Sequence, residues 1–182
     1  EIRVYRDLMG ANEKWASEIR TLLAGRGMLM LNLIGSPGSG KTTLLEQMAA
    51  DLKARCRFAV LEGDVETTKD AERLQKLDVP VSQLLSGGSC HLEAKLVHRA
   101  LTDFLDIEPD VVFVENVGNL VCPAEFDIGE HAKVAVLSIT EGEEKPLKYP
   151  LLFREAKAVV LTKTDLLPYV PFDLDACREH IR

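Results

Sequence analysis

The segment whose residue types and spacing point most clearly to chemistry is Gly35-Ser36-Pro37-Gly38-Ser39-Gly40-Lys41-Thr42. It fits the pattern G-x-x-x-x-G-K-[ST], and it lies between an apolar run of strand length and a segment with helical periodicity. Glycines let successive backbone N–H groups converge on one anion, and a helix N-terminus adds partial positive charge. We predict a phosphate-binding loop in which Lys41 reaches the β and γ phosphates, Thr42 binds Mg²⁺ and Thr43 adds a further nucleotide contact.

A second candidate element is Glu115-Asn116-Val117-Gly118, which follows the apolar run DVVFV. A carboxylate at the end of a buried strand can hold or orient Mg²⁺, and we predict this role for Glu115. The N–H of Gly118 can bond to a γ-phosphate and lose that bond after hydrolysis, which would make the segment a switch. A strand-end acid followed by a turn glycine has the same pattern, so the four residues alone leave both interpretations open.

A third candidate is Asp64, which ends the predicted strand RFAVLEGD. We predict that its carboxylate binds Mg²⁺ or orients the attacking water. Glu66 and Asp70 rank below it, because acids in the first turn of a helix are also favoured by the helix dipole alone.

The segment Thr162-Lys163-Thr164-Asp165 is similar to the N-K-x-D element of GTPases, with Thr in place of Asn. In that pattern the Asp accepts hydrogen bonds from the guanine N1–H and amino group, which adenine does not offer, and the Lys stem packs over the base. We therefore predict that Thr162, Lys163 and Asp165 contact guanine. A threonine side chain reaches less far than asparagine, and a strand exit with solvated charges remains the alternative.

Cys90, His91 and Cys122 form a possible metal site. Cys90 and His91 follow the predicted strand VPVSQLL, and Cys122 lies four residues beyond Gly118. Both segments leave the same predicted edge of the sheet, and thiolate plus imidazole suits zinc, nickel or copper. Spacing alone also allows buried, unliganded cysteines. We expect only structural roles for His98, His131, Cys56 and Cys177.

Strands and helices alternate along the chain, which predicts a doubly wound, mainly parallel α/β sheet of the P-loop NTPase type. We expect one domain over residues 1–182, with a helical extension at 1–27 whose helix covers about 11–25. The predicted strands are 28–35, 57–64, 79–85, 110–116, 132–139 and 156–163. The predicted helices are 41–54, 66–77 and 92–105, with an irregular helical stretch at 145–156 interrupted by Pro150.

Composition excludes several classes of function. The net charge of −7, from 29 acidic against 22 basic residues, argues against a nucleic-acid binder. No apolar run approaches the roughly 18 to 20 residues needed to cross a bilayer, and the N-terminus has no signal-peptide core. The four cysteines include no C-x-x-C pair, which favours reduced thiols and a cytoplasmic location.

Taken together, these segments resemble the HypB family of hydrogenase-maturation nickel GTPases, within the wider group that includes urease-maturation GTPases. The likeness covers roughly residues 28–170. It rests on GSPGSGKTTLLE, GDVETTKDAERL, SGGSCHLEAKLV, ENVGNLVCPAEFDIGE, LSITEGEEKPLKYP and LTKTDLLPY. The Cys-Pro-His motif typical of the urease-linked relatives is absent from this sequence.

The resemblance implies a cytoplasmic enzyme that binds GTP and GDP with Mg²⁺, hydrolyses GTP and forms a homodimer when it binds GTP. No Ras-like glutamine is evident in the sequence, so we expect slow intrinsic hydrolysis. It implies a Ni²⁺ or Zn²⁺ site at the dimer interface, with Cys90, His91 and Cys122 from each chain. It also implies nickel delivery toward a nickel–iron hydrogenase, with the hydrogenase large subunit and a small nickel-binding chaperone as partners. By the same likeness, Lys145 or Lys148 contacts nucleotide across the interface.

The sequence departs from the family pattern in three respects. It has no His-rich N-terminal segment, Thr162 replaces the commoner Asn, and it ends at Arg182 where relatives continue, so we expect a truncated C-terminus. Two alternative functions stay open. One is a P-loop kinase of a small metabolite, which needs an acceptor site and a lid. The other is a non-enzymatic nickel or zinc storage protein.

Overall fold

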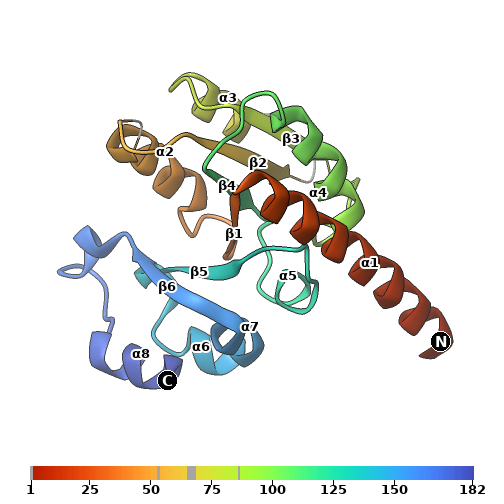
Figure 1. The fold of residues 1–182 in the computed structure, drawn as a ribbon. Helices are drawn as coiled ribbons and strands as arrows, with labels where there is room; N and C mark the ends of the chain where they lie inside the picture. The colour runs from red at the N-terminus through yellow and green to blue at the C-terminus, as the bar shows by residue number, and fades with distance from the viewer. Residues whose placement is uncertain (1, 53, 65–68, 86) are drawn as a thin grey trace.

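Six strands form one parallel sheet in the order β3-β2-β4-β1-β5-β6 (Figure 1). This computed structural model describes the backbone of residues 2–52, 54–64, 69–85 and 87–182, and the side chains from residue 10 onward except at 53, 64–69 and 86. The strands are β1 (Leu29–Ile34), β2 (Phe58–Asp64), β3 (Val81–Leu85), β4 (Val111–Glu115), β5 (Ala132–Ser138) and β6 (Ala156–Thr162). The predicted parallel α/β architecture is therefore confirmed.

Helices cover both faces of the sheet. The longer ones are α1 (Ile2–Arg26), α2 (Lys41–Leu52), α3 (Lys69–Gln75), α4 (Ala94–Leu101) and α8 (Leu174–Ile181). The shorter segments are α5 (Cys122–Glu125), α6 (Lys145–Lys148), α7 (Pro150–Glu155), η1 (Thr102–Phe104), η2 (Ile139–Glu141) and η3 (Thr164–Leu166). The predicted interruption near Pro150 separates α6 from α7, because proline is tolerated at the start of a helix and not inside one. No helix in the described part of the chain is both long and apolar enough to cross a membrane.

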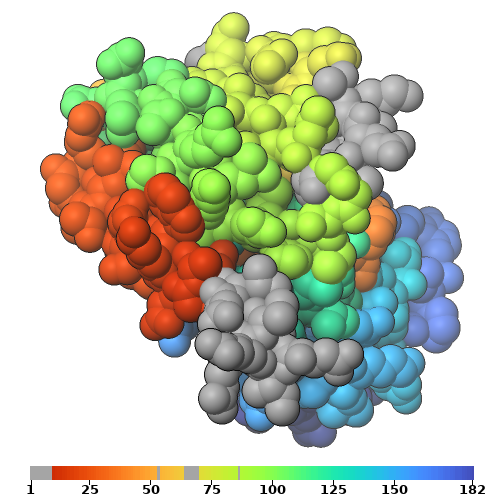
Figure 2. Space-filling model, turned by 90° about the vertical axis from the view of Figure 1, so that its right-hand side faces the viewer, coloured from red at the N-terminus to blue at the C-terminus, as the bar shows by residue number. Residues whose placement is uncertain are grey.

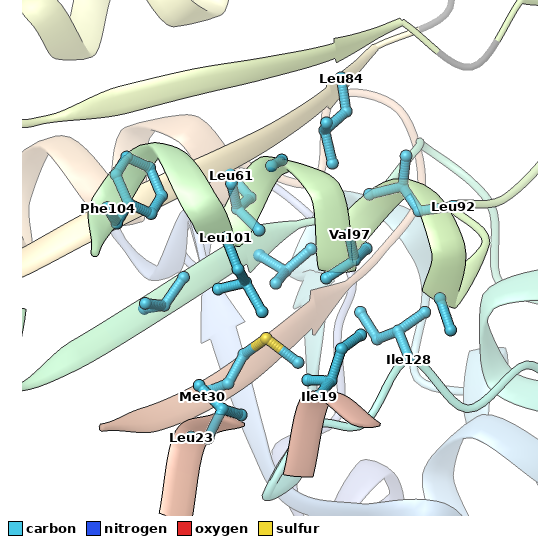
Figure 3. Close-up of a cluster of buried hydrophobic side chains, with 14 of the residues drawn as sticks. Ile19, Leu23, Met30, Leu61, Leu84, Leu92, Val97, Leu101, Phe104 and Ile128 are labelled. Atoms are coloured by element: carbon cyan, nitrogen blue, oxygen red, sulfur yellow. The ribbon is translucent and has the colours of Figure 1, made fainter. Parts of the chain in front are cut away.

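The core beneath α1 and α4 fixes how the N-terminal extension joins the domain. Ile19 and Leu23 of α1 meet Val97 and Leu101 of α4 over Met30 of β1, and all five are buried (Figure 3). The space-filling view shows α1, in red and orange, lying against the green α4 (Figure 2). Burying such side chains contributes roughly 1.5–3 kcal/mol each, so the extension is part of the packed structure.

Two further clusters fill the rest of the core. Leu45 and Ala49 of α2 and Leu74 of α3 pack on the opposite face of the sheet. Phe153 of α7 and Cys177 of α8 pack against the strands β5 and β6. Helix α8 was not predicted, although Asp173 is a recognisable N-cap whose carboxylate accepts hydrogen bonds from the backbone N–H groups of residues 175 and 176.

Candidate nucleotide and metal sites

The predicted phosphate loop runs from the end of β1 into the first turn of α2. Gly38 and Gly40 have φ angles of 73° and 93°, a region that side chains with a Cβ rarely adopt. The Ser39 N–H bonds to Ser36 O at 3.1 Å, which closes the turn. A Cβ at Gly35 would lie 2.5 Å from Val136 O, so only glycine fits against β5 at this point. The loop therefore has the backbone turn that the sequence pattern requires.

Three charged or polar side chains converge beneath this loop. Lys41 is 7% exposed, and its Nζ donates to Gly35 O at 3.3 Å and Ser36 O at 3.4 Å. Thr42 Oγ1 donates to Glu115 Oε1 at 2.7 Å. Burial lowers the pKa of Lys41 and raises that of Glu115 to about 6, although the attraction between the two opposes both shifts. Burial is therefore the stronger effect for each group.

The arrangement around Glu115 fits Mg²⁺. The second carboxylate oxygen, Oε2, is buried and has no hydrogen-bond partner among the described residues. Burying an oxygen in this way is costly unless a ligand or solvent satisfies it. A carboxylate bonded to the phosphate-loop hydroxyl on one side, with a free oxygen on the other, supplies the hard oxygen donors that Mg²⁺ prefers.

Gly118 lies directly against the phosphate loop. A Cβ added to it would be 2.8 Å from Pro37 Cγ and 3.0 Å from Pro37 N, so a glycine is needed for this approach. Both residues line a cleft of about 510 Å³, together with Lys41, Thr42 and Glu115. Gly118, the predicted γ-phosphate sensor, is thus in van der Waals contact with the loop that would hold the phosphate. A larger, more open cleft of about 600 Å³ lies at the opposite end of β5 and β6, away from these residues.

Acidic residues near the cleft partly match the prediction. Asp64 ends β2, beside Leu85 of β3, but its side chain lies outside the described residues, as does Glu66. Asp70 lies in the first turn of α3 and also lines the cleft. Glu62 was missed. It is 2% exposed and stands in register with Glu115 on the neighbouring strand, so two carboxylates face the cleft.

Arg73 was also missed as a residue of the cleft. Its guanidinium pairs with Glu46 at 2.6 Å and with Asp70 at 3.0 Å, and it donates to Thr43 Oγ1 at 3.4 Å. These contacts hold a cation at the rim of the pocket. A charged residue in a helix pattern gives no sign of this position, because an exposed helix face carries the same residue types.

The segment Thr162–Asp165 follows β6 at the same edge of the sheet. The Thr162 hydroxyl donates to Ser39 O and ties this segment to the phosphate loop, a contact that threonine can make in place of asparagine. Lys163 has a left-handed backbone with φ of 56° and lines the cleft. Asp165 is exposed in η3. Of the three, only Lys163 lines the cleft, Thr162 reaches it through its bond to the phosphate loop, and the guanine contacts of these residues stay a prediction.

Cys90, His91 and Cys122 are brought together, as expected for a metal site. Their ligand atoms all lie within 4.8 Å of one another, and the two sulfurs are 2.7 Å apart. The cluster is the only group of three or more His, Cys, Asp or Glu residues of this kind in the described part of the chain. Burial lowers the pKa of His91, which favours the neutral imidazole that metals require.

Two neighbours hold this thiol–imidazole cluster in place. The Phe126 ring stacks on His91 with centroids 3.7 Å apart. Asn119 donates from Nδ2 to Cys90 O at 3.1 Å and accepts from Val121 N at 2.9 Å, which joins the two loops that carry the cysteines. His91 Nε2 is buried without a hydrogen-bond partner among the described residues. The nitrogen that faces Cys90 is Nδ1, 3.6 Å from Cys90 Sγ, and an imidazole beside two thiols supplies the donor set of a zinc or nickel site.

The remaining candidates have structural contacts. Lys145 pairs with Glu141 at 3.3 Å and Lys148 with Glu144 at 3.3 Å, and neither lines the phosphate-loop cleft. The rings of His98 and Trp15 are 5.0 Å apart, and His131 Nδ1 accepts from Met30 N at 3.0 Å. Cys56 and Cys177 are free thiols outside the metal cluster.

A parallel sheet with a glycine-rich anion loop between β1 and α2 defines this chain as a P-loop nucleotide-binding protein. Comparison with known families agrees, because the model of the CobW/HypB/UreG nucleotide-binding domain matches residues 29–182. Hydrogenase maturation factor HypB of Azotobacter vinelandii is 48% identical over 181 residues, and its Escherichia coli K12 counterpart is 47% identical over 176 residues. The chain covers 60% and 61% of those two proteins, so it spans about three fifths of their length.

Solved structures give the same result. HypB from Helicobacter pylori in complex with nickel superposes with a TM-score of 0.89 at 39% identity, covering 94% of this chain and 80% of that one. HypB from Archaeoglobus fulgidus gives a TM-score of 0.88 at 32% identity, covering 94% and 84%. The chain therefore belongs to the HypB branch of the CobW/HypB/UreG family.

Proposed function

We propose that this chain binds and slowly hydrolyses GTP, and that it uses the nucleotide state to control a nickel ion bound by Cys90, His91 and Cys122. The observation that carries the proposal is the position of Gly118. It contacts Pro37 of the phosphate loop, and it lies only four residues before Cys122 in the same connection. One short segment therefore touches both sites, which is the arrangement that coupling between nucleotide and metal requires.

The residues of the cleft divide the work of hydrolysis. The loop amides at 35–42 and the Lys41 ammonium would hold the phosphates and offset the charge that develops on the γ-phosphoryl group. Thr42, Glu115 and Asp64 would hold Mg²⁺, which neutralises charge between the phosphates, and Asp64 would also orient water. The described residues that line the cleft include no glutamine to position the nucleophile, so we expect a slow intrinsic rate.

Guanine selectivity would come from Asp165, with the Lys163 stem over the base. The bond from Thr162 to Ser39 O supports this assignment, because it fixes the base-binding segment relative to the phosphate loop. We propose that loss of the γ-phosphate releases Gly118 and moves Cys122. Nickel would then be bound in one nucleotide state and released in the other.

The biological setting follows from the relatives, which are hydrogenase maturation factors, one of them seen with nickel. We propose that this chain works in the cytoplasm as a homodimer that delivers nickel toward a hydrogenase large subunit with a small nickel-binding chaperone. Residues 1–182 would act as one GTPase unit, with 1–27 as its helical extension. The packing of α1 on α4 supports treating the extension as part of this unit.

One titration tests the proposal. The purified chain is titrated with GTP and with ATP, each with and without nickel, while the oligomer mass is followed by light scattering. We expect GTP to bind more tightly than ATP, nickel to bind with different affinity in GDP and in a non-hydrolysable GTP analogue, and the mass to double with the analogue. Equal nickel affinity in the two nucleotide states would refute the coupling.

A further inference from the structure

A row of buried polar side chains runs across the sheet beneath the loop that joins the two sites. Asn32 lies in the middle of the central strand β1 and is fully buried. Asn116 follows β4 and is 1% exposed, and the Glu130 side chain, just before β5, is 5% exposed. Burying an amide or a carboxylate among apolar strands is unfavourable unless each group is hydrogen-bonded. These three residues therefore need one another.

The hydrogen bonds connect them in a single direction. The Asn116 amide donates to Asn32 Oδ1 at 3.1 Å, and the Asn32 amide donates to Glu130 Oε1 at 3.1 Å. At one end the Val117 N–H donates to Asn116 Oδ1 at 3.0 Å, and at the other the Ile128 N–H donates to Glu130 Oε2 at 2.8 Å. Each donor points toward the carboxylate, so the bonds polarise one another.

We call this series of hydrogen bonds, from the Val117 N–H through Asn116, Asn32 and Glu130 to the Ile128 N–H, the relay. Its two ends are also the two ends of the loop at 117–128. Val117 and Ile128 are both buried in the core cluster beneath α1 and α4, where Ile128 points toward Ile19 and Val97 (Figure 3). Between them Leu120 and Ala124 pack in the cluster beside β5 and β6, whereas Gly118 and Cys122 are partly exposed. The loop is therefore closed at its base by hydrogen bonds and apolar packing, and it projects both functional residues from that base.

We propose that Asn32 and Glu130 are positioning residues that clamp the base of the 117–128 loop, so that displacement of Gly118 is passed to Cys122 instead of being absorbed at the loop ends. Neither residue lines the phosphate-loop cleft or belongs to the thiol–imidazole cluster. The inference rests on the proposed function, because it explains how nucleotide and nickel are coupled. It assigns a role to residues that contact neither ligand.

The test compares nickel affinity in the GDP state with that in the non-hydrolysable GTP analogue state, for the full chain and for Asn32→Leu. Leucine fills a similar volume but makes neither amide bond, so the relay is cut in the middle. Coupling factors between sites are typically about 5- to 150-fold. In wild type the nickel affinities of the two nucleotide states should differ by a factor in this range. In Asn32→Leu we expect the ratio of the two affinities to lie within about twofold of one, which is a near loss of the coupling, while the affinity for GDP itself changes little.

Glu130→Gln is the second variant. Its carbonyl oxygen can still accept from Asn32, but its amino group then faces the Ile128 N–H, so the far end of the relay opens. We expect the same loss of the affinity ratio. Val112→Ala, a core substitution in β4, weakens the apolar cluster that also holds Val117 and Ile128 but leaves every hydrogen bond of the relay in place, so it is the control for lost packing and should keep the wild-type ratio.

Each outcome decides the question. A wild-type ratio retained in a folded Asn32→Leu or Glu130→Gln chain would overturn the inference and leave the proposed function standing. A ratio lost equally in Val112→Ala, or failure of both relay variants to fold, would assign the relay to stability alone. A wild-type ratio of one would remove the coupling itself, and the inference with it.

Discussion

The phosphate loop and the thiol–imidazole cluster leave the same edge of the sheet, yet different forces hold them. The phosphate loop is built from backbone. Its glycines take positive φ angles, and its neighbours Lys41, Thr42 and Glu115 are all less than a tenth exposed. The cluster is built from side chains on two surface loops, and it is held by the Phe126 ring and the Asn119 amide.

This difference implies a division between a rigid site and an adjustable one. A site enclosed by the core can change shape only at a large energetic cost, because packed interiors tolerate little displacement. A site on surface loops can open and close within local stability limits. The nucleotide site is therefore suited to setting the state, and the metal cluster to responding to it.

Lys41→Ala should have the largest effect, and this effect should be confined to the nucleotide site. Loss of a charge that stabilises the transferring phosphoryl group lowers rates by about 100- to 1,000-fold in comparable sites. We expect GTP hydrolysis to fall by that amount, measured by phosphate release, with nickel affinity of the nucleotide-free chain unchanged. Lys157→Ala, on β6 away from the cleft, is the matched control. A large loss of nickel affinity in Lys41→Ala would contradict the division.

Cys122→Ser removes one proposed ligand of the thiol–imidazole cluster and should affect metal binding alone. Changes to groups that merely support a metal ligand cost about 10- to 100-fold in affinity, and removing a ligand should cost at least that. Nickel affinity, followed by the thiolate charge-transfer absorbance, should fall by at least that factor. GDP affinity should stay within about twofold of the wild-type value, a change in binding free energy well below the roughly 1.4 kcal/mol of a tenfold change. Cys56→Ser should leave both affinities unchanged. Normal nickel binding by Cys122→Ser would exclude Cys122 as a ligand.

Glu115→Gln sharpens the contrast through pH. The folded-state pKa of about 6 exceeds the ordinary value of 4.5, so the fold binds the proton more tightly than the unfolded chain does. The free energy of unfolding should fall as pH rises from 4.5 to 6 and then level off, a cost of about 2 kcal/mol at neutral pH. The variant should lack that cost.

Urea unfolding in EDTA, without nucleotide, between pH 4 and 8 measures the effect. Wild type and Glu179→Gln, an exposed carboxylate on α8, should show the same pH dependence, and Glu115→Gln should be more stable than both at pH 7.5. The same variant should bind nucleotide less tightly when Mg²⁺ is present. A Glu115→Gln profile that still declines between pH 4.5 and 6 would assign the titration to another group.

Thr162→Val should give the smallest effect. It removes the hydroxyl that donates to Ser39 O and leaves the side-chain volume nearly unchanged. The net contribution of such a bond is about 1 kcal/mol. We expect GTP affinity, measured by fluorescent-analogue displacement, to fall about fivefold with nickel affinity unchanged. Thr140→Val, in η2, is the control. An unchanged GTP affinity would remove Thr162 from the nucleotide site.

Local patterns predicted the parts of the molecule that local forces determine. The β1–loop–α2 unit follows from glycine spacing and apolar periodicity, and the parallel sheet follows from the alternation of strands and helices. The role of Cys90, His91 and Cys122 stayed open from spacing, because their convergence depends on how β3 and β4 are placed in the sheet. The Mg²⁺ role of Asp64 remains a prediction.

The missed features share one physical cause. Glu62 and Asn32 are single polar residues within apolar strands. Glu62 is in register with Glu115 of β4, and Asn32 bonds to Asn116, just after β4, and to Glu130, just before β5, so these neighbours are far away in sequence. Arg73 reads as an ordinary exposed helix residue until its contacts with Glu46 and Asp70 are seen. The one usable signal is the cost of burial, since a polar residue inside a buried strand requires a partner.

Because the 117–128 loop is held together at its base, its exposed part near Cys122 tolerates changes of sequence and length. Lengthening a loop whose ends are already held together costs little, about 0.6 kcal/mol for each doubling of its length. The exposed Val121, beside Cys122, can therefore be substituted, or an insertion placed there, while β4, β5 and the phosphate loop keep their register, whereas Leu120 and Ala124 are fixed by burial. Metal preference could then be redesigned in that exposed part, with the nucleotide machinery carried over intact.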